Sequence, residues 1–498
     1  MDGEASDEKA GRLFPAPSPP PTVLCPQRLP GCDLESLKAL QHVLIDNHNR
    51  YHIFFNHIKF NNHITHRALA IYAMGGSGPV IEAFYQQDSQ NQRPAFASPK
   101  PITEQNFVEH LGDENFYEAY TTFFDKAIEE KGAAATLEEF VFSDKYNFNP
   151  GRDAASQPNM LSRFVDGLMH PLIHCGYGVE FGLKGMLSEG LAMTALRDDH
   201  PRRFLPLPLF VAQVTSDVDK TEAKFTSMVL DDTPMIPNKA AIEQGTHAFS
   251  ILARVLKDPS LAPDGPRQYI AQYPDTLTAH EDKIRAYVDQ WTIDLSIPGE
   301  IERKMEECIW TTSVMYAVGG WSEKGFTADF FLMHLVTSSL FIPSLIASLS
   351  PRAQVLFLRV YFASAIASWI SRGRPCFNFK RFFKSTSPVP NTPNNLAVPP
   401  ADSAPTQDAQ PPNPFLPLIQ SSITHPDDHH TKIQRAFAHF STIYGFQSKG
   451  YFAGTELDGA DELDGSLFLR AAVLTADHMG WVGKGEEAKE WSSEGFYV

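Results

Sequence analysis

Cysteine is scarce in this sequence, and the few cysteines present offer no covalent framework. There are five, scattered along the chain without a CxxC pair: Cys25, Cys32, Cys175, Cys308 and Cys376. Their odd number and wide spacing argue against a disulfide scaffold and against a structural zinc site. We therefore expect a reducing compartment and predict a cytoplasmic location.

Positive charge is also in short supply. Lysine and arginine total 42 against 59 aspartates and glutamates, which gives a formal net charge of −17. A nucleic-acid-binding protein needs a basic face to meet phosphate groups. We therefore expect no nucleic-acid partner and favour a small ligand of little charge.

The sequence has no uninterrupted apolar run of the roughly 20 residues that span a membrane. The longest apolar candidate, Phe330 to Leu349, is broken by His334, Thr337 and Pro343, so it is predicted to be a buried core helix. Residues 1–9 are polar and acidic and do not resemble a signal peptide. No membrane association is expected.

Nucleotide-binding motifs are missing as well. Neither GxxxxGK[ST] nor GxSxG occurs, and Gly76-Ser77-Gly78 lacks the third glycine of a dinucleotide fingerprint. That fingerprint must follow a strand, whereas this one follows a helical run, so we interpret it as a helix cap. No cofactor-binding residues for a flavin or a nicotinamide are predicted.

Apolar residues recur with a helical period through most of the chain. Strand signals are sparse, and residues 204–216 form the most extended-looking run. The fold class is therefore predicted to be mainly α. The expected helices are 34–60, 63–74, 106–131, 160–173, 181–196, 239–256, 278–292, 300–318, 328–349, 353–371, 427–444 and 467–479.

Two proline-rich segments divide the chain. Residues 1–33 are predicted to be a disordered tail, and residues 385–417 a disordered surface insertion. Residues 34–384 are predicted to form a helical core that residues 418–498 complete. The expected architecture is one large helical domain.

The residues that point to chemistry are histidines. His63 and His66 are three apart, and His170 and His174 are four apart, so each pair shares one face of a helix. Pro171 is compatible with the first turn of a helix that leaves His170 just outside it. His334 lies in an apolar helix. Paired histidines from several helices are how bundles build internal metal centres.

Other interpretations of these histidines stay open. A lone histidine on an apolar face is usually a core residue, and HxxH and HxxxH pairs occur by chance in many helices. Imidazole also suits iron, copper, zinc and nickel alike, so spacing does not identify a metal. His48, His52 and His57 lie on the preceding predicted helix and are interpreted as surface residues or as supports for the ligands.

Four blocks in this order resemble the questin oxidase-like family. They are Asn62-His63-Ile64-Thr65-His66, His170 to His174 with Gly176 to Phe181, Asp329 to Ser339, and Asp427 to Ala436. The resemblance implies a helical oxidoreductase of fungal secondary metabolism. It also implies Baeyer-Villiger-like cleavage of anthraquinone rings, with a non-haem iron centre in part of the family.

The resemblance implies roles for particular residues. The predicted metal set is His63, His66, His170, His174, His334 and Lys432. Lys432 is included because a neutral buried amine can take up carbon dioxide to form a carbamate, an oxygen ligand; the alternative is an ion pair with Asp428. His63, Tyr177 and Glu180 are the predicted catalytic or positioning groups.

The expected cofactor is Fe(II), and the expected partners are dioxygen and a small aromatic polyketide. NADPH is a possible reductant, although the sequence offers no motif to bind it. Two rival functions remain. One is a metal-free, NADPH-dependent Baeyer-Villiger oxidase whose histidines do acid–base work, and the other is a non-catalytic carrier of polyphenols.

Overall fold

The computed structural model describes residues 11–153, 156–200, 204–211, 245–263, 265, 269–390 and 413–497. Within these ranges the regular secondary structure is almost wholly helical, as the apolar periodicity predicts. The regular strands in the described part are two short ones, β1 (Trp321–Ser322) and β2 (Gly325–Phe326), which pair antiparallel.

The first half of the chain forms short and medium helices around a buried core. The α-helices are α2 (Leu34–Arg50), α3 (Ile64–Ala73), α4 (Gly78–Asp88), α5 (Tyr117–Lys131), α6 (Ala133–Leu137), α7 (Met160–Phe164), α8 (Asp166–Phe181), α9 (Lys184–Leu196) and α10 (Leu207–Val211). The 3₁₀ turns are η1 (Ser89–Asn91), η2 (Phe107–His110) and η3 (Glu114–Phe116), and η4 (Glu138–Phe142) is a π-helical turn.

The α-helices of the second half include the longest in the described part of the chain. They are α13 (Ala248–Lys257), α14 (Tyr269–Val288), α15 (Glu300–Ala317), α16 (Phe330–Ser339), α17 (Ile342–Ile346), α18 (Pro351–Ser371), α19 (Phe379–Ser385), α20 (Phe415–Ile423), α21 (Asp428–Tyr444) and α22 (Ser466–Met479). The 3₁₀ turns here are η6 (Pro259–Leu261), η7 (Ala460–Glu462) and η8 (Val482–Lys484).

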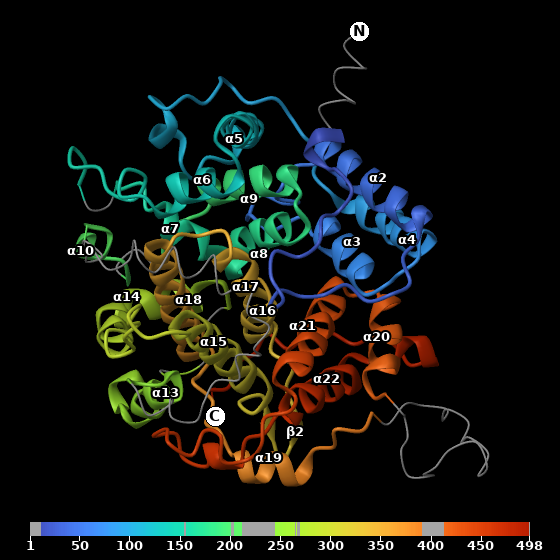
Figure 1. Cartoon of the computed structure of the whole chain (residues 1–498), viewed down its shortest axis with the longest axis vertical. Coiled ribbons are helices and arrows are strands. Elements are labelled where there is room, and N and C mark those ends of the chain that lie inside the picture. The colour runs from blue at the N-terminus through green and yellow to red at the C-terminus, as the bar shows by residue number, and fades with distance from the viewer. Residues whose placement is uncertain are drawn as a thin grey trace.

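Four helices from distant parts of the sequence meet in the interior. Helix α3 contacts α8 and α21, and α16 contacts both α8 and α21. Figure 1 shows these four around the middle of the molecule, with α2 and α4 outside α3 and with α15 and α18 beside α16. This convergence brings together the sequence blocks that carry the conspicuous histidines.

Several predicted helix boundaries are wrong. The helix expected over 34–60 ends at Arg50, because the chain turns extended at Tyr51 and pairs with Pro94. The helix expected over 328–349 is two, α16 and α17, since Pro343 starts a new helix rather than continuing the old one. The extended run expected from 204 contains α10 instead, and its residues beyond 211 lie outside the described part.

The helix expected over 239–256 begins only at Ala248, where His247 caps it; its first residues, 239–244, are not described. Helix α14 begins nine residues earlier than the predicted start at 278. Helix α4 was not predicted at all. Ser77 is its N-cap, so the Gly76-Ser77-Gly78 turn links two helices, in agreement with a capping role.

Residues 11–33 belong to the packed structure rather than to a disordered tail. Phe14 and Cys25 are fully buried, and Phe14 stacks edge-on against His48. Its ring fills the space above Gly185, where a Cβ atom would lie 2.3 Å from it. Most of the predicted proline-rich insertion, residues 391–412, falls outside the described residues.

One helix among the described residues, α18, has the length and apolar composition of a membrane span. Of its most apolar 18-residue window, 83% is buried inside the protein. Core helices of large folds have the same composition.

Candidate metal centre

Helix α3 presents the first pair of histidines. His63 is its N-cap residue and His66 lies in its first turn. Asn62 holds this start in place: its side-chain oxygen accepts from the Ile64 N–H at 3.0 Å and its amide donates to Asn47 on α2 at 2.8 Å. The His63 and His66 rings stack with centroids 5.7 Å apart.

Helix α8 presents the second pair, after an unusual turn. Gly167, Leu168 and Met169 have φ values of +56°, +58° and +63°, so regular helix begins only at His170 and Pro171. This agrees with the predicted placement of Pro171 in the first turn. The turn aims the Gly167 carbonyl at the His170 ring, whose Nδ1–H donates to it at 2.7 Å.

The two pairs face each other. His63 Nε2 and His170 Nε2 are 2.7 Å apart, and His66 Nε2 and His174 Nδ1 are 2.9 Å apart. His174 turns its other nitrogen to the buried carboxylate of Glu189, 2.9 Å away, and Glu189 also contacts His48 at 2.6 Å. His48 is thus a support for the pair, one of the two roles offered from the sequence.

Helix α16 adds His334. Its Nδ1–H donates to the Phe330 carbonyl at 2.7 Å, whereas its Nε2 is buried without a hydrogen-bond partner in the described part of the chain. The His334 and His170 ring centroids are 4.9 Å apart. The apolar setting expected of His334 is correct, since the residue is 1% exposed.

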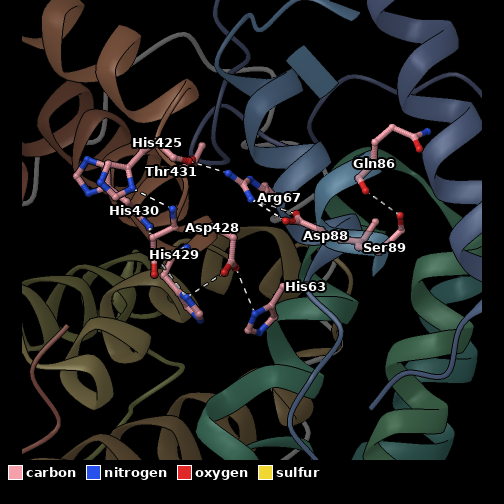
Figure 2. Close-up of polar contacts among 12 residues, drawn as sticks. His63, Arg67, Gln86, Asp88, Ser89, His425, Asp428, His429, His430 and Thr431 are labelled. Carbon is pink, nitrogen blue, oxygen red and sulfur yellow. Dashed lines mark hydrogen bonds and ion pairs between the residues drawn. The ribbon is translucent and has the colours of Figure 1, made fainter. Parts of the chain in front are cut away.

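Helix α21 contributes two residues that sequence reasoning missed, Asp428 and His429. Asp428 lies 3.2 Å from His63 Nδ1 and 3.2 Å from His429 Nδ1 (Figure 2). It also lies 2.7 Å from Lys432 Nζ. The inner His429 nitrogen, Nε2, has no hydrogen-bond partner among the described residues. His429 and Lys432 are three apart on one helix, a signal that was present in the sequence.

The histidines described above, here called the histidine cluster, are His63, His66, His170, His174, His334 and His429. Three of them are close enough to hold one metal ion. His63, His170 and His429 each offer a nitrogen, and these nitrogens all lie within 4.8 Å of one another. Lys432, in contrast, is buried against Asp428. This is the ion pair that the sequence offered as the alternative to a carbamate, although it is inside the protein and not on its surface.

The two remaining predicted residues, Tyr177 and Glu180, lie at the edge of the histidine cluster. The Tyr177 ring is buried and stacks on His66 with centroids 5.3 Å apart. Glu180 turns away and forms a buried ion pair with Arg435. Tyr177 therefore belongs to the wall of the cluster, and Glu180 reaches it only through Arg435 and Tyr177.

Burial sets the protonation state of the inner rings. It lowers the pKa of His63 to about 4 and moves the pKa values of His66, His170 and His334 well below the ordinary value, with neighbouring cations adding to the effect. Desolvation favours a neutral imidazole because the charged ring loses its water. Neutral rings carry the lone pairs that a metal needs.

The α21 side behaves differently. Burial opposes charge on both Asp428 and His429, yet they favour each other's charged forms. The pKa of Asp428 falls well below its ordinary value beside His429 and Lys432, and the pKa of His429 rises beside Asp428. The Asp428 carboxylate thus places a negative charge against both His63 and His429, and Asp427 lies 3.7 Å from His429 Nδ1.

Arg67 joins α3 to the start of α21. Its guanidinium donates to Asp88 at 2.9 Å and to the His425 carbonyl at 2.7 Å (Figure 2). It also lies 3.4 Å from the centroid of the Phe84 ring. Because Arg67 is 2% exposed, losing the His425 carbonyl would leave a buried guanidinium N–H without a hydrogen-bond acceptor. It therefore fixes the distance between the two helices that carry His63 and His429.

Known proteins resemble this chain over most of its length. The family model described as questin oxidase-like matches residues 60–437, a range that contains every histidine of the cluster. Questin oxidase of Aspergillus terreus is 25% identical over 325 residues, which is 64% of this chain and 65% of the relative. Baeyer-Villiger oxidase AgnL3 of Paecilomyces divaricatus is 25% identical over 63% of this chain and 62% of its own length.

A third relative, oxidoreductase AflY of Aspergillus parasiticus, is 22% identical over 63% of this chain and 59% of its own length. In each case the matched part spans less than two thirds of the relative. The histidine blocks quoted from the sequence all lie within residues 60–437.

Proposed function

Because this chain belongs to the questin oxidase-like family, we propose that it is an oxidoreductase of fungal secondary metabolism that carries out a Baeyer-Villiger oxidation. In this reaction one oxygen atom of dioxygen enters a C–C bond beside a ring carbonyl, and the other leaves as water. The two further electrons come from NADPH. The proposed substrate is an anthraquinone or related aromatic polyketide.

We further propose that the histidine cluster holds a divalent iron. This proposal is supported by the hydrogen bonds of the rings, in which one nitrogen faces a protein acceptor and the other faces the cluster. The outer nitrogens of His170 and His334 donate to backbone carbonyls, and that of His174 faces Glu189. Metal-binding histidines tie their outer nitrogen in this way, which orients the ring and leaves the inner lone pair free.

The inner nitrogens fit a metal for a second reason. Buried polar atoms in proteins are normally hydrogen-bonded, yet the inner nitrogens of His334 and His429 have no partner in the described part of the chain, and those of His63 and His170 face each other. Two neutral rings whose bare nitrogens meet at 2.7 Å gain nothing from each other unless one of them is protonated or both bind the same metal ion. Imidazole donors suit iron, copper, zinc and nickel.

Within this proposal His63, His170 and His429 are the core ligands, with His66, His174 and His334 around them. When bound, iron supplies the electron transfer to dioxygen that amino-acid side chains cannot perform. The protein's own tasks are to keep the rings neutral, to hold their orientation and to exclude bulk water. Asp428 contributes a compensating negative charge, and Lys432 holds that carboxylate in place.

Aromatic side chains border the cluster where a flat substrate would meet it. Phe330 is half-buried and contacts His334 and His429 edge-on, with centroids 4.7 and 5.0 Å away. Tyr177 stacks on His66 from another side. Flat apolar ligands bind in sites lined by such rings.

The decisive experiment is turnover with labelled oxygen. Protein loaded with Fe(II) under argon receives NADPH, ¹⁸O₂ and a hydroxyanthraquinone, and the product is weighed by mass spectrometry. We expect one labelled oxygen in a ring-expanded or ring-opened product. The His170→Ala variant should lose both iron and turnover, whereas His439→Ala, which alters a histidine of α21 bonded to the Leu24 carbonyl, should retain them.

The rival functions give different results in the same experiment. If protein stripped of metal by a chelator turned over at the same rate, the iron proposal would be rejected and the metal-free oxidase supported. Binding of the anthraquinone without oxygen uptake would replace it with the carrier. The histidines argue against a carrier, because burying polar rings is costly unless they are used.

A further inference from the structure

Residues 491–493, here called the C-terminal strap, run across the beginning of α16. The Ser492 N–H donates to the Ala328 carbonyl, and the Phe330 N–H donates to the Ser492 carbonyl, both at 2.9 Å. Ser492 thus pairs in parallel with Asp329. Asp329 is the N-cap of α16, and its side chain accepts from the Phe331 and Leu332 N–H groups.

The strap is also tied to this cap through Arg372. The buried Arg372 guanidinium holds the Asp329 carboxylate at 2.6 Å and donates to the Ser493 carbonyl at 2.8 Å. One cation therefore joins the cap of α16 to the strap. His334 lies five residues beyond this cap on the same helix.

The strap reaches the beginning of α21 as well. The Trp491 indole N–H donates to Asp427 Oδ1 at 2.9 Å. The same oxygen accepts from the His429 and His430 backbone N–H groups at 2.9 and 3.1 Å, because Asp427 is the N-cap of α21. The indole therefore binds the carboxylate that fixes the first turn of the helix carrying His429.

From these contacts we infer that Trp491 is a positioning residue of the candidate metal centre. Through the strap it holds the N-terminal ends of α16 and α21 against each other, so that His334 and His429 face one another with ring centroids 5.0 Å apart. The strap lies outside residues 60–437, the range that the family model matches. The inference rests on the proposed function for its consequence, but its structural content is independent of any metal.

The test compares Trp491→Phe with Trp481→Phe. The first substitution keeps an aromatic ring and removes the N–H that reaches Asp427. The second removes a similar indole N–H that donates to Asp477 at 2.8 Å, in the same region of the chain. Both variants are examined by hydrogen–deuterium exchange and by titration with Co(II) alone, whose visible absorption reports the ligand geometry.

In Trp491→Phe we expect faster amide exchange in residues 330–335 and 428–433. We also expect weaker Co(II) binding, by about 10- to 100-fold as for other residues that orient ligands, with shifted absorption bands. Trp481→Phe should change neither region nor the bands. Unchanged exchange at the two helix ends, or faster exchange with unaltered Co(II) affinity and spectrum, would overturn the inference.

Absence of metal binding would be a separate outcome. If the wild-type protein binds no Co(II), the iron proposal fails and the exchange data alone judge the strap. Faster exchange at both helix ends would then still support it, and unchanged exchange would still overturn it.

Discussion

Asp428 is the residue on which the charge balance of the candidate site depends. It contacts His63, His429 and Lys432, and its pKa is held well below the ordinary value by the last two, against the cost of burial. We predict that Asp428→Asn lowers metal affinity by about 10- to 100-fold, because the ring orientation of two histidines is lost. Fe(II) titration under argon measures the change.

Lys432→Ala is the companion variant. If Lys432 is the partner of Asp428, its removal leaves the histidine ligands in place, and the protein should still bind about one metal ion per chain, with affinity reduced less than in Asp428→Asn. Metal loss as complete as in His170→Ala would instead restore the carbamate hypothesis, in which Lys432 is itself a ligand.

The left-handed turn before His170 offers a test of local strain. Gly167 has φ +56°, and a Cβ atom there would lie 2.6 Å from the Arg197 guanidinium. Gly167→Ala should therefore lower the free energy of unfolding by about 1–2 kcal/mol or more, from the backbone conformation alone. Urea denaturation measures it. Gly151→Ala, at an exposed glycine without positive φ, is the control and should shift stability little.

Single residues were the easiest part to identify from the sequence. His63, His66, His170, His174 and His334 all lie in the cluster, because their spacing on helices and their apolar neighbours are local signals. Asp428 and His429 were missed as site residues, although the three-residue spacing of His429 and Lys432 places both on one face of the helix. Glu180 was placed near the site by the family resemblance, and its partner Arg435, 255 residues away, was not foreseeable.

At the scale of elements, α15 carries a buried acid that makes stability depend on pH. Burial, with Glu307 nearby, raises the pKa of Glu306 to about 8 from an ordinary 4.5, while Trp310 donates to it at 3.2 Å. The folded protein thus keeps a proton that the unfolded chain releases. The free energy of unfolding contributed by this group is full below pH 4.5 and falls as pH rises toward 8.

We predict that Glu306→Gln removes this dependence. The amide oxygen can still accept from Trp310 but has no proton to lose. Between pH 5 and 8 the wild type should lose about 1 kcal/mol more per pH unit than the variant. Parallel slopes of unfolding free energy against pH in the two proteins would show that Glu306 does not titrate in this window.

The presence of most helices could be predicted from the sequence, whereas the residues at which they begin and end could not. Periodicity identified α5, α9, α15, α18 and α22 because each has a long apolar face. The end of α2 at Arg50 and the break before α17 depend on pairing with Pro94 and on Pro343, respectively. The turn at residues 167–169 uses Leu168 and Met169 in a conformation that favours glycine, so no local preference announces it.

At the scale of the whole molecule, a metal in the cluster would link α3, α8, α16 and α21, whose outermost ligands, His63 and His429, are 366 residues apart in sequence. A ligand that binds only the folded state stabilises it by mass action. With free Fe(II) at about 100 times its dissociation constant, the free energy of unfolding should rise by about 2.7 kcal/mol. Chemical denaturation with metal and with a chelator measures this, and His439→Ala should respond like the wild type.

No gain in stability with metal would mean that Fe(II) binds the unfolded chain as tightly as the folded protein, or that it binds neither. The same comparison in His63→Ala should show a much smaller gain, because one of the three nitrogens that lie within 4.8 Å of one another is gone.

We propose that histidines from four helices surround one metal ion. Elemental analysis of protein purified without affinity metals and then loaded anaerobically with Fe(II) tests it most directly. We expect about one iron per chain in the wild type and in His439→Ala, and almost none in the double variant His170→Ala, His429→Ala. Equal iron content in the wild type and the double variant, or none in either, would contradict it.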